Sequence, residues 1–213
     1  MKIISWNLLR LTGASVAEVA RLIEQERPDL MLMQEATQKF DALPGLVGGA
    51  YTRAPLPGRV HGLAMWMPAM PVNRAEVFPI PSGAIVHRVC QTLDLGPFTV
   101  ANVHLSHGQI LNRRQLRRIV RRLPARAAVI GDYNLVGPTL LPGFRDVGPR
   151  RFTHRMSDVV PLRLDRCLVR GLICTEANVL LRGGSDHYPI MMTLIPVAGA
   201  SHAGHSPAQA RVA

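Results

Sequence analysis

The sequence has few aromatic residues, few cysteines and no long apolar stretch. Aromatic side chains make up 5% of the 213 residues, which leaves little material for stacking the bases of single-stranded nucleic acid. The three cysteines, Cys90, Cys167 and Cys174, form no CxxC pair. An odd, scattered set argues against a disulfide framework, so we expect a reducing compartment, the cytoplasm. No apolar run reaches the roughly 18 residues that a membrane-spanning helix needs.

Acidic residues and lysine are also scarce. Asp and Glu number 14 against 25 Lys and Arg, and the net charge is +11. Lysine occurs only at Lys2 and Lys39, so the other 23 basic residues are arginine. Arginine forms bidentate contacts with phosphate oxygens, although an arginine bias can also reflect genomic base composition. The positive net charge predicts attraction to polyanions.

Six apolar segments, each typical of a buried strand, carry polar side chains of catalytic types. In chain order these side chains are Asn7, Glu35, His104, Asp132 with Asn134, Asp165, and Asp186 with His187. Polar groups at the ends of apolar strands are costly in a core but suit an active site. Asp132 and Asn134 are two positions apart, so extended geometry would point both side chains the same way.

The order of these motifs resembles that of the endonuclease/exonuclease/phosphatase superfamily. The motifs that carry the resemblance are Trp6-Asn7, Gln34-Glu35, His104, Gly131-Asp132-Tyr133-Asn134, Leu164-Asp165-Arg166 and Ser185-Asp186-His187-Tyr188-Pro189. That superfamily includes deoxyribonucleases, abasic-site endonucleases, inositol polyphosphate 5-phosphatases and neutral sphingomyelinases. The resemblance covers about residues 1–195. It implies a four-layer α/β sandwich, with two packed mixed, largely antiparallel sheets flanked by helices and the active site at one sheet edge.

The pattern of elements predicts one catalytic domain over residues 1–196, followed by a disordered tail over residues 197–213. The tail consists of small and polar residues without periodicity. A capping box at Ser15 and Glu18 predicts a helix to about Gln25, followed by a strand over 31–35. Gly96-Pro97 predicts a hairpin between 87–95 and 98–105. A helix is expected over 112–123, and further strands over 61–67, 75–79, 127–131, 162–169, 172–181 and 188–195.

The residue types predict hydrolysis of a phosphoester assisted by Mg²⁺ or Mn²⁺. Glu35 is the best metal ligand, because a hard carboxylate oxygen suits these ions and no Cys/His cluster indicates zinc. Asn7 is expected to support the metal or to hold a phosphate oxygen. Asp186 is expected to be a second carboxylate ligand or to position the metal-bound water.

His187 is predicted to be the general base, because an imidazole titrates near neutral pH and can accept a proton from water. Asp165 would fix the tautomer of His187, a pair that the family resemblance also implies. Asp132 and Asn134 would orient the attacking water and bind the phosphate. His104 would serve as a second acid or as a phosphate donor. The other histidines of the domain have no motif context, and we expect no role for His61, His87, His107 and His154.

One arginine-rich helix is the candidate nucleic-acid surface. Outside its apolar stripe it carries Arg113, Arg114, Arg117, Arg118, Arg121 and Arg122. Such a run is either a solvated face or a surface that follows phosphates, because like charges on one helix repel one another unless an anion offsets them. With so few aromatics, contact with the backbone of duplex DNA is the favoured interpretation. A monomer is favoured as well.

Three functions are compatible with this reading. The first is a metal-dependent nuclease acting on DNA. The second is a phosphatase or phospholipase C-type phosphodiesterase on inositol phosphates or phospholipids, although no amphipathic anchor is evident. The third is an inactive nucleic-acid-binding module, which the complete set of polar residues argues against. Abasic-site endonucleases usually have an acid at the position of Leu9, so this residue argues against exonuclease III-type specificity. Only 32 residues separate Asp132 from Asp165, a short interval for the family, so trimmed recognition loops are expected.

Overall fold

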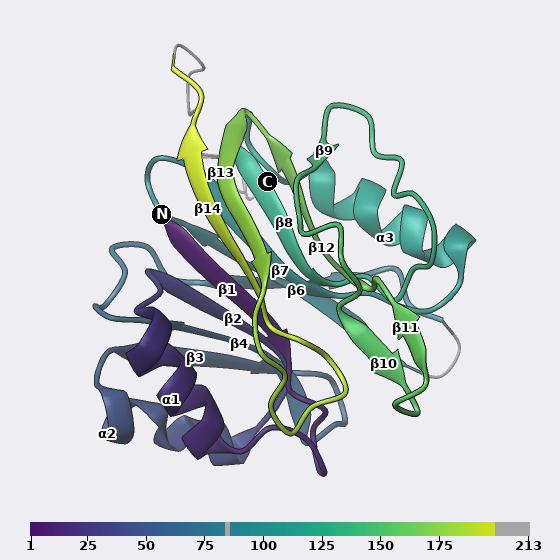
Figure 1. The fold of residues 1–213 in the computed structure, drawn as a ribbon. Coiled ribbons are helices and arrows are strands. Elements are labelled where there is room, and N and C mark those ends of the chain that lie inside the picture. The colour runs from purple at the N-terminus through teal and green to yellow at the C-terminus, as the bar shows by residue number, and fades with distance from the viewer. Residues whose placement is uncertain (84–85, 199–213) are drawn as a thin grey trace, which may run out of the picture.

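Two six-stranded β-sheets packed face to face form the centre of the protein (Figure 1). The computed structural model describes residues 1–83 and 86–198. In spatial order the first sheet consists of β13 (Leu172–Val179), β14 (Ile190–Pro196), β1 (Lys2–Asn7), β2 (Leu30–Thr37), β4 (His61–Met67) and β3 (Ala50–Pro55). The second consists of β5 (Glu76–Ile80), β6 (Arg88–Asp94), β7 (Thr99–His104), β8 (Ala127–Asp132), β12 (Asp165–Arg170) and β9 (Arg145–Asp146). Both sheets are mixed, because β1 runs parallel to β2 and β7 parallel to β8.

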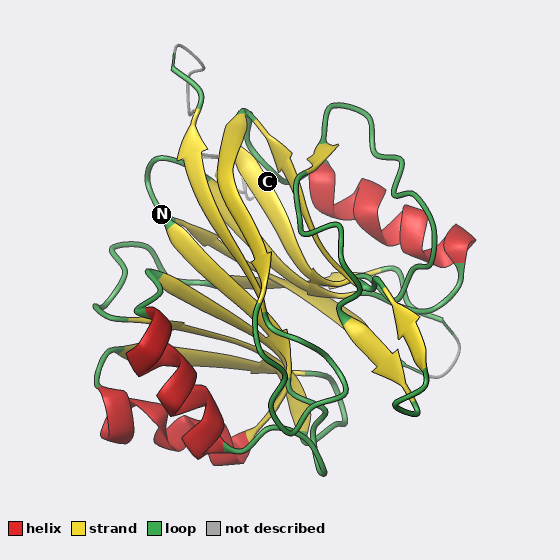
Figure 2. Cartoon of the chain, viewed as in Figure 1, coloured by secondary structure: helices red, strands yellow, loops and turns green. Residues whose placement is uncertain are grey.

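Helices cover the outer faces of both sheets (Figure 2). On the first sheet lie α1 (Val16–Glu26), the 3-10 helix η1 (Gln38–Ala42) and α2 (Leu43–Val47), and on the second lies α3 (Gln109–Val120). A small hairpin of β10 (His154–Met156) and β11 (Val160–Leu162) stands beside the sandwich. Helix α1 begins with the predicted capping box, in which Ser15 and Glu18 hydrogen-bond to each other's main-chain amides. The predicted four-layer α/β sandwich is therefore confirmed.

Apolar residues fill the three spaces between these four layers. Ile3, Leu32, Val100, Ile130 and Ile190 belong to the cluster between the sheets. Trp6, Val19, Ile23 and Met33 belong to the cluster under α1, and Val103, Leu116, Ile119 and Val129 to the one under α3. Burying one such side chain contributes about 1.5–3 kcal/mol, so the scaffold that holds the sheet edges in place is well supplied with apolar contacts.

Several element boundaries differ from the sequence prediction. Helix α3 begins at Gln109 rather than 112, although Leu116 and Ile119 are buried as expected. The strand predicted over 162–169 is interrupted, because β11 ends at Leu162 and β12 begins at Asp165. The short elements β3, β9, β10, η1 and α2 carry too little periodicity to be predicted. From residue 199 onward the predicted tail lies outside the described residues. None of the described helices is long and apolar enough to cross a membrane.

A buried polar network joins the two sheets directly behind the candidate site. The side-chain amide of Gln34 donates to Asn102 Oδ1 at 2.7 Å and to Ser5 Oγ at 3.1 Å. Asn102 Nδ2 in turn donates to the main-chain oxygen of Ala64 at 3.0 Å. Buried amides hold a fixed geometry only when they are hydrogen-bonded, so this network fixes the position of the chain that leads into Glu35.

Gly131 lets β7 and β8 approach closely, and its replacement is expected to destabilise the fold. A Cβ at this position would lie 2.0 Å from the main-chain oxygen of Val103, and its φ is +143°. We expect Gly131→Ala to lower the free energy of unfolding by roughly 3 kcal/mol through overpacking and backbone strain. Gly45→Ala is the matched control, because nothing lies within 4 Å of a Cβ there. Thermal unfolding of both variants checks this, and equal melting temperatures would contradict it.

Candidate active site

The register of the second sheet places three of the predicted residues in one row. The parallel pair β7 and β8 sets His104 opposite Asp132, and the antiparallel pair β8 and β12 sets Asp132 opposite Asp165. Asn7, at the end of β1 in the first sheet, donates from Nδ2 to Asp132 Oδ2 at 2.9 Å. The edges of the two sheets therefore meet at Asp132.

The imidazole of His187 lies between two buried carboxylates. Its Nδ1 is 2.8 Å from Asp165 Oδ2 and its Nε2 is 3.7 Å from Asp132 Oδ2. Burial by itself would lower the pKa of His187, but the charges of Asp165 and Asp132 raise that pKa to about 10. Without further cations the ring is thus an imidazolium at neutral pH. It also keeps apart two aspartates that would otherwise face each other across neighbouring strands.

Hydrogen bonds from neighbouring motif residues hold His187 in place. Ser185 Oγ donates to the main-chain oxygen of Asn7 at 2.7 Å and accepts from the amide of His187 at 3.1 Å. Trp6 Nε1 donates to the main-chain oxygen of His187 at 2.9 Å. Residues at the two ends of the chain are tied together in this way. The sequence analysis gave Trp6 and Ser185 no role, and their place inside the motifs was the only signal.

Glu35 reaches the site from a bulge in β2. The pairing of β2 with β4 shifts register between Met33 and Ala36, and the φ of Glu35 is 57°. A left-handed conformation costs a non-glycine residue about 1–2 kcal/mol, and bulges commonly redirect a side chain next to an active site. The strand therefore breaks its regular geometry at the residue that we predicted to bind metal.

The carboxylate of Glu35 is half-buried and forms no hydrogen bond or salt bridge within residues 1–83 and 86–198. Burial raises its pKa, and the charges of Arg10 and Arg88 oppose that shift. A carboxylate that is partly removed from water and has no hydrogen-bond or salt-bridge partner is stabilised by a nearby cation. This environment fits a hard divalent ion such as Mg²⁺ or Mn²⁺.

Of the three predicted metal ligands, Glu35 and Asp186 share no group of close ligand atoms in the described part of the chain. Asn7 uses Nδ2 for Asp132, and its Oδ1 accepts from the amide of Leu9 at 3.1 Å, so one lone pair remains for another partner. Two groups of three possible ligand atoms lie within 4.8 Å of one another in the described chain: Asp132, Asp165 and His187, and His154, Asp186 and His187. Glu35 is in neither group, and Asp186 faces a histidine instead.

Asn134 and His104 complete the surroundings of Asp132. Strand β8 ends at Asp132, and Asn134 is left-handed with φ 47°, so the extended geometry assumed from the sequence does not apply there. The Asn134 amide donates to Asp132 Oδ1 at 2.8 Å, while its side chain donates to the Leu105 main-chain oxygen. Burial and the charge of Arg88 lower the pKa of His104 to about 3. A neutral His104 suits the hydrogen-bond donor role among the two predicted.

Three further residues reach this region without having been predicted. Arg88, 9% exposed, interacts electrostatically with Asp132 and Glu35. His61 is buried, and its pKa is lowered by burial and by the charges of Arg10 and Arg88. His154 Nε2 is 3.2 Å from Asp186 Oδ2. All three stand at or near the start of a strand, but the sequence contains no motif that separates them from ordinary strand residues.

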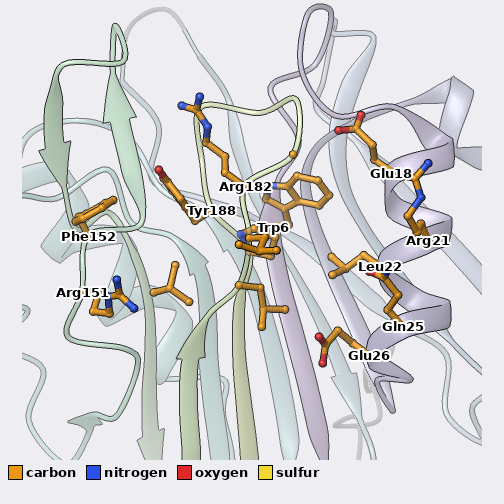
Figure 3. A pocket seen from close by; sticks show the side chains of 15 residues that line it. Trp6, Glu18, Arg21, Leu22, Gln25, Glu26, Arg151, Phe152, Arg182 and Tyr188 are labelled. Atoms are coloured by element: carbon orange, nitrogen blue, oxygen red, sulfur yellow. The ribbon is translucent and has the colours of Figure 1, made fainter.

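A groove of about 510 Å³ lies beside these segments on the outer face of the first sheet. Figure 3 shows α1 with Arg21 and Glu26 on one side of it, Phe152 and Tyr188 on the other, and Trp6 between them. None of the predicted site residues lines it. Because side chains alternate along extended chain, Trp6 and Tyr188 face the groove while their neighbours Asn7 and His187 face the carboxylates.

Comparison with known proteins agrees with the motifs. The model of the endonuclease/exonuclease/phosphatase family matches residues 4–187. The chain belongs to this family. Members of the family are generally hydrolytic phosphoesterases and typically depend on divalent metals, and the Asp and His groups described above are of the kind that can bind one.

Solved structures of the family show the same fold. A family protein from Bacteroides vulgatus aligns with a TM-score of 0.77 at 15% identity, covering 92% of this chain and 98% of that one. Humanized TDP2 of D. rerio aligns with 0.73 at 18% identity, covering 92% and 98%. A mannosyl-6-phosphatase of Bacteroides thetaiotaomicron aligns with 0.69 at 17% identity, covering 92% and 99%. No curated protein matches the sequence.

Proposed function

We propose that this family member is a metal-dependent hydrolase of phosphodiester bonds that acts as a nuclease on DNA. The observation that carries the proposal is the placement of His187 between Asp165 and Asp132, with Glu35 unpaired nearby. The net charge of +11 supports a polyanionic substrate. The three cysteines are free, which supports our proposal of a cytoplasmic protein, and we keep the monomer as a prediction.

In this proposal the residues divide the tasks of catalysis among them. Asp165 fixes the Nδ1–H tautomer of His187, so that Nε2 accepts the proton of the attacking water. Asp132 orients that water, and Asn7, Asn134 and neutral His104 hold phosphate oxygens or Asp132 itself. A divalent cation bound at Glu35 and supported by Asp186 would neutralise phosphoryl charge and lower the pKa of the groups around it.

The function is tested with supercoiled plasmid, Mg²⁺ or Mn²⁺, and an EDTA control. We expect nicking that depends on the metal. Inositol phosphates, phospholipid head groups and mannose 6-phosphate are assayed in parallel with the same preparation. Plasmid left intact with every metal, together with release of phosphate from a small substrate, would replace the nuclease by a phosphatase. DNA binding without any turnover would instead indicate an inactive binding module.

A phosphatase is the second candidate, and the fold shared with a mannosyl-6-phosphatase favours it. The salt dependence of the activity distinguishes a nuclease from a phosphatase. A protein that neutralises several backbone phosphates loses affinity steeply as the salt concentration rises. Binding of one small phosphate substrate releases few counterions, so its affinity depends only weakly on salt. We propose that the activity of this protein falls steeply as the salt concentration rises, as expected for an enzyme with a polyanionic substrate.

The arginines of α3 and the two that directly follow its end at Val120 are expected to act unequally. Six of them are exposed: Arg113, Arg114, Arg117, Arg118, Arg121 and Arg122. Helix α3 follows β7 by a short loop and so starts on the side of His104. A helix rises about 1.5 Å per residue, so the end of α3 at Val120, which Arg121 and Arg122 follow, lies roughly 10 Å beyond Arg113 and Arg114.

The double variant Arg113→Ala/Arg114→Ala is therefore expected to raise KM for DNA several-fold. It should also reduce the slope of log KM against log salt concentration by about two, one for each lost charge. Arg121→Ala/Arg122→Ala is the matched control with the same loss of charge and a smaller expected effect. KM and its salt dependence are measured on a duplex substrate. Equal effects of both pairs would assign the arginines to general attraction, and no effect of either would remove α3 from the DNA surface.

The pH dependence follows from the raised pKa of His187. A base must be neutral, and a pKa of about 10 leaves His187 protonated at pH 7. We expect kcat/KM on a small phosphodiester to rise with pH by up to about tenfold per unit until His187 loses its proton. A bound cation lowers the pH at which kcat/KM levels off, but kcat/KM still rises with pH below that point. The residual rate of His187→Ala serves as control. A rate that falls between pH 7 and 9 would assign His187 an imidazolium role instead.

A further inference from the structure

His154 and Asp186 form a second histidine–carboxylate pair beside the one made by His187 and Asp165. His154 Nε2 lies 3.2 Å from Asp186 Oδ2. The ring of His154 packs against that of His187, with centroids 4.5 Å apart and planes inclined by 59°. Only 9% of His154 is exposed, and its Nδ1 has no hydrogen-bond partner among the described residues.

Main-chain pairing fixes these side chains relative to each other. His154 forms an antiparallel bridge with His187. The amide of Arg155 donates to the Asp186 main-chain oxygen at 3.0 Å, and the amide of Tyr188 donates to the Thr153 main-chain oxygen at 2.7 Å. The hairpin that begins with β10 is thus anchored by main-chain pairing on the segment that carries Asp186 and His187.

We propose that His154, Asp186 and His187 form a site for a first-row transition metal ion such as Zn²⁺. This site does not include Glu35, and it takes up Asp186, which would otherwise support the Mg²⁺ ion at Glu35. One potential ligand atom from each of the three lies within 4.8 Å of the others. Two ligands of a tetrahedral zinc with bonds of about 2.0–2.1 Å are about 3.3 Å apart, close to the spacing between His154 and Asp186.

The chemistry of the donors selects the ion. Two imidazoles and one carboxylate favour Zn²⁺, Co²⁺ or Ni²⁺ over Mg²⁺, which takes oxygen ligands. His187 is prepared for such an ion, because its Nδ1 is held by Asp165 and Nε2 keeps a free lone pair once the ring is neutral. A carboxylate on the far nitrogen is the usual support of a metal-bound histidine.

Occupation of this site has a consequence that rests on the proposed function. An ion on Nε2 of His187 takes the lone pair that would accept the proton of water. Zn²⁺ therefore inhibits Mg²⁺-supported hydrolysis, and it does so through residues other than Glu35. Binding of the ion itself does not depend on what reaction the protein catalyses.

Direct binding is the first test, using the full chain. Co²⁺ is titrated and its visible absorption recorded, and Zn²⁺ affinity is measured by calorimetry. We expect His154→Phe and Asp186→Asn to weaken binding at least tenfold and to lose the Co²⁺ spectrum. His87→Phe is the control, because this exposed histidine lies outside the cluster, and it should bind like the wild type. A His154→Phe protein that is folded by circular dichroism and keeps the wild-type spectrum and affinity would overturn the site, and Asp186→Asn gives the same decision if His154→Phe does not fold.

The second test measures Zn²⁺ inhibition of each variant relative to its own Mg²⁺-supported rate. We expect the inhibitory concentration to rise at least tenfold in His154→Phe. Inhibition unchanged in that variant would overturn the link between the site and catalysis. Zn²⁺ binding that depends on His154 in a protein without any hydrolytic activity would sink the proposed function and leave the metal site standing, so the two failures are distinguishable.

Discussion

His187→Ala is expected to lower kcat for metal-dependent phosphodiester hydrolysis by about 10²–10⁴-fold, the usual contribution of a positioned acid or base. The ring it removes contacts both Asp165 and Asp132, so proton transfer and charge balance are lost together. The measurement is the single-turnover rate at saturating Mg²⁺, with plasmid or a small diester as substrate. A rate within a few-fold of the wild type would exclude His187 from the reaction.

The role of Asp165 is separated from that of His187 by a double-mutant cycle. Asp165 is fully buried and contacts His187, so we expect Asp165→Asn to slow the wild type strongly but to add little in the His187→Ala background, since groups that act as one unit are not additive. Thermal unfolding accompanies each rate, because removing His187 leaves two buried carboxylates facing each other and breaking such a pair costs about 3–5 kcal/mol. If the free-energy effects of the two substitutions on the rate simply add, Asp165 acts independently of His187.

The sequence was sufficient to predict the scaffold because its signals are local. The capping box at Ser15, the Gly96-Pro97 turn and the apolar runs each depend on a few adjacent residues, and all of them reappear as elements of the structure. The family motifs then ordered those elements into two sheets. Short pieces such as β10 and η1 escaped prediction because so few residues, without a clear apolar alternation, carry no usable period.

The site was predicted only in part because proximity across sheets is a tertiary property. The register that sets Asp132 opposite both His104 and Asp165 cannot be read from spacing along the chain. Arg88 and His154 were missed for the same reason, since each meets the site through strands that are distant in sequence. The positive φ of Glu35 and Asn134 is likewise imposed by the surroundings, because local preference alone opposes it.

Glu35→Gln is expected to weaken Mg²⁺ binding strongly while leaving the fold intact or slightly more stable. Loss of the charged oxygen removes the hard ligand, and we expect apparent Mg²⁺ affinity to fall by at least about tenfold, since even indirect partners of a metal contribute that much. Burial raises the pKa of Glu35, so its ionised form opposes folding at every pH above its unfolded value, and a neutral amide removes this cost. A residue that is kept for function at a cost in stability is a common origin of stabilising substitutions at functional sites.

The measurement pairs Mg²⁺ calorimetry with thermal unfolding in EDTA. Glu24→Gln is the matched control, because this glutamate lies exposed on α1 and should change neither quantity. Wild-type Mg²⁺ affinity in Glu35→Gln would move the metal to the Asp132 and Asp165 group. A clear fall in melting temperature without metal would show that Glu35 has a stabilising partner in the fold, and that outcome would contradict its assignment as a carboxylate held ready for a cation.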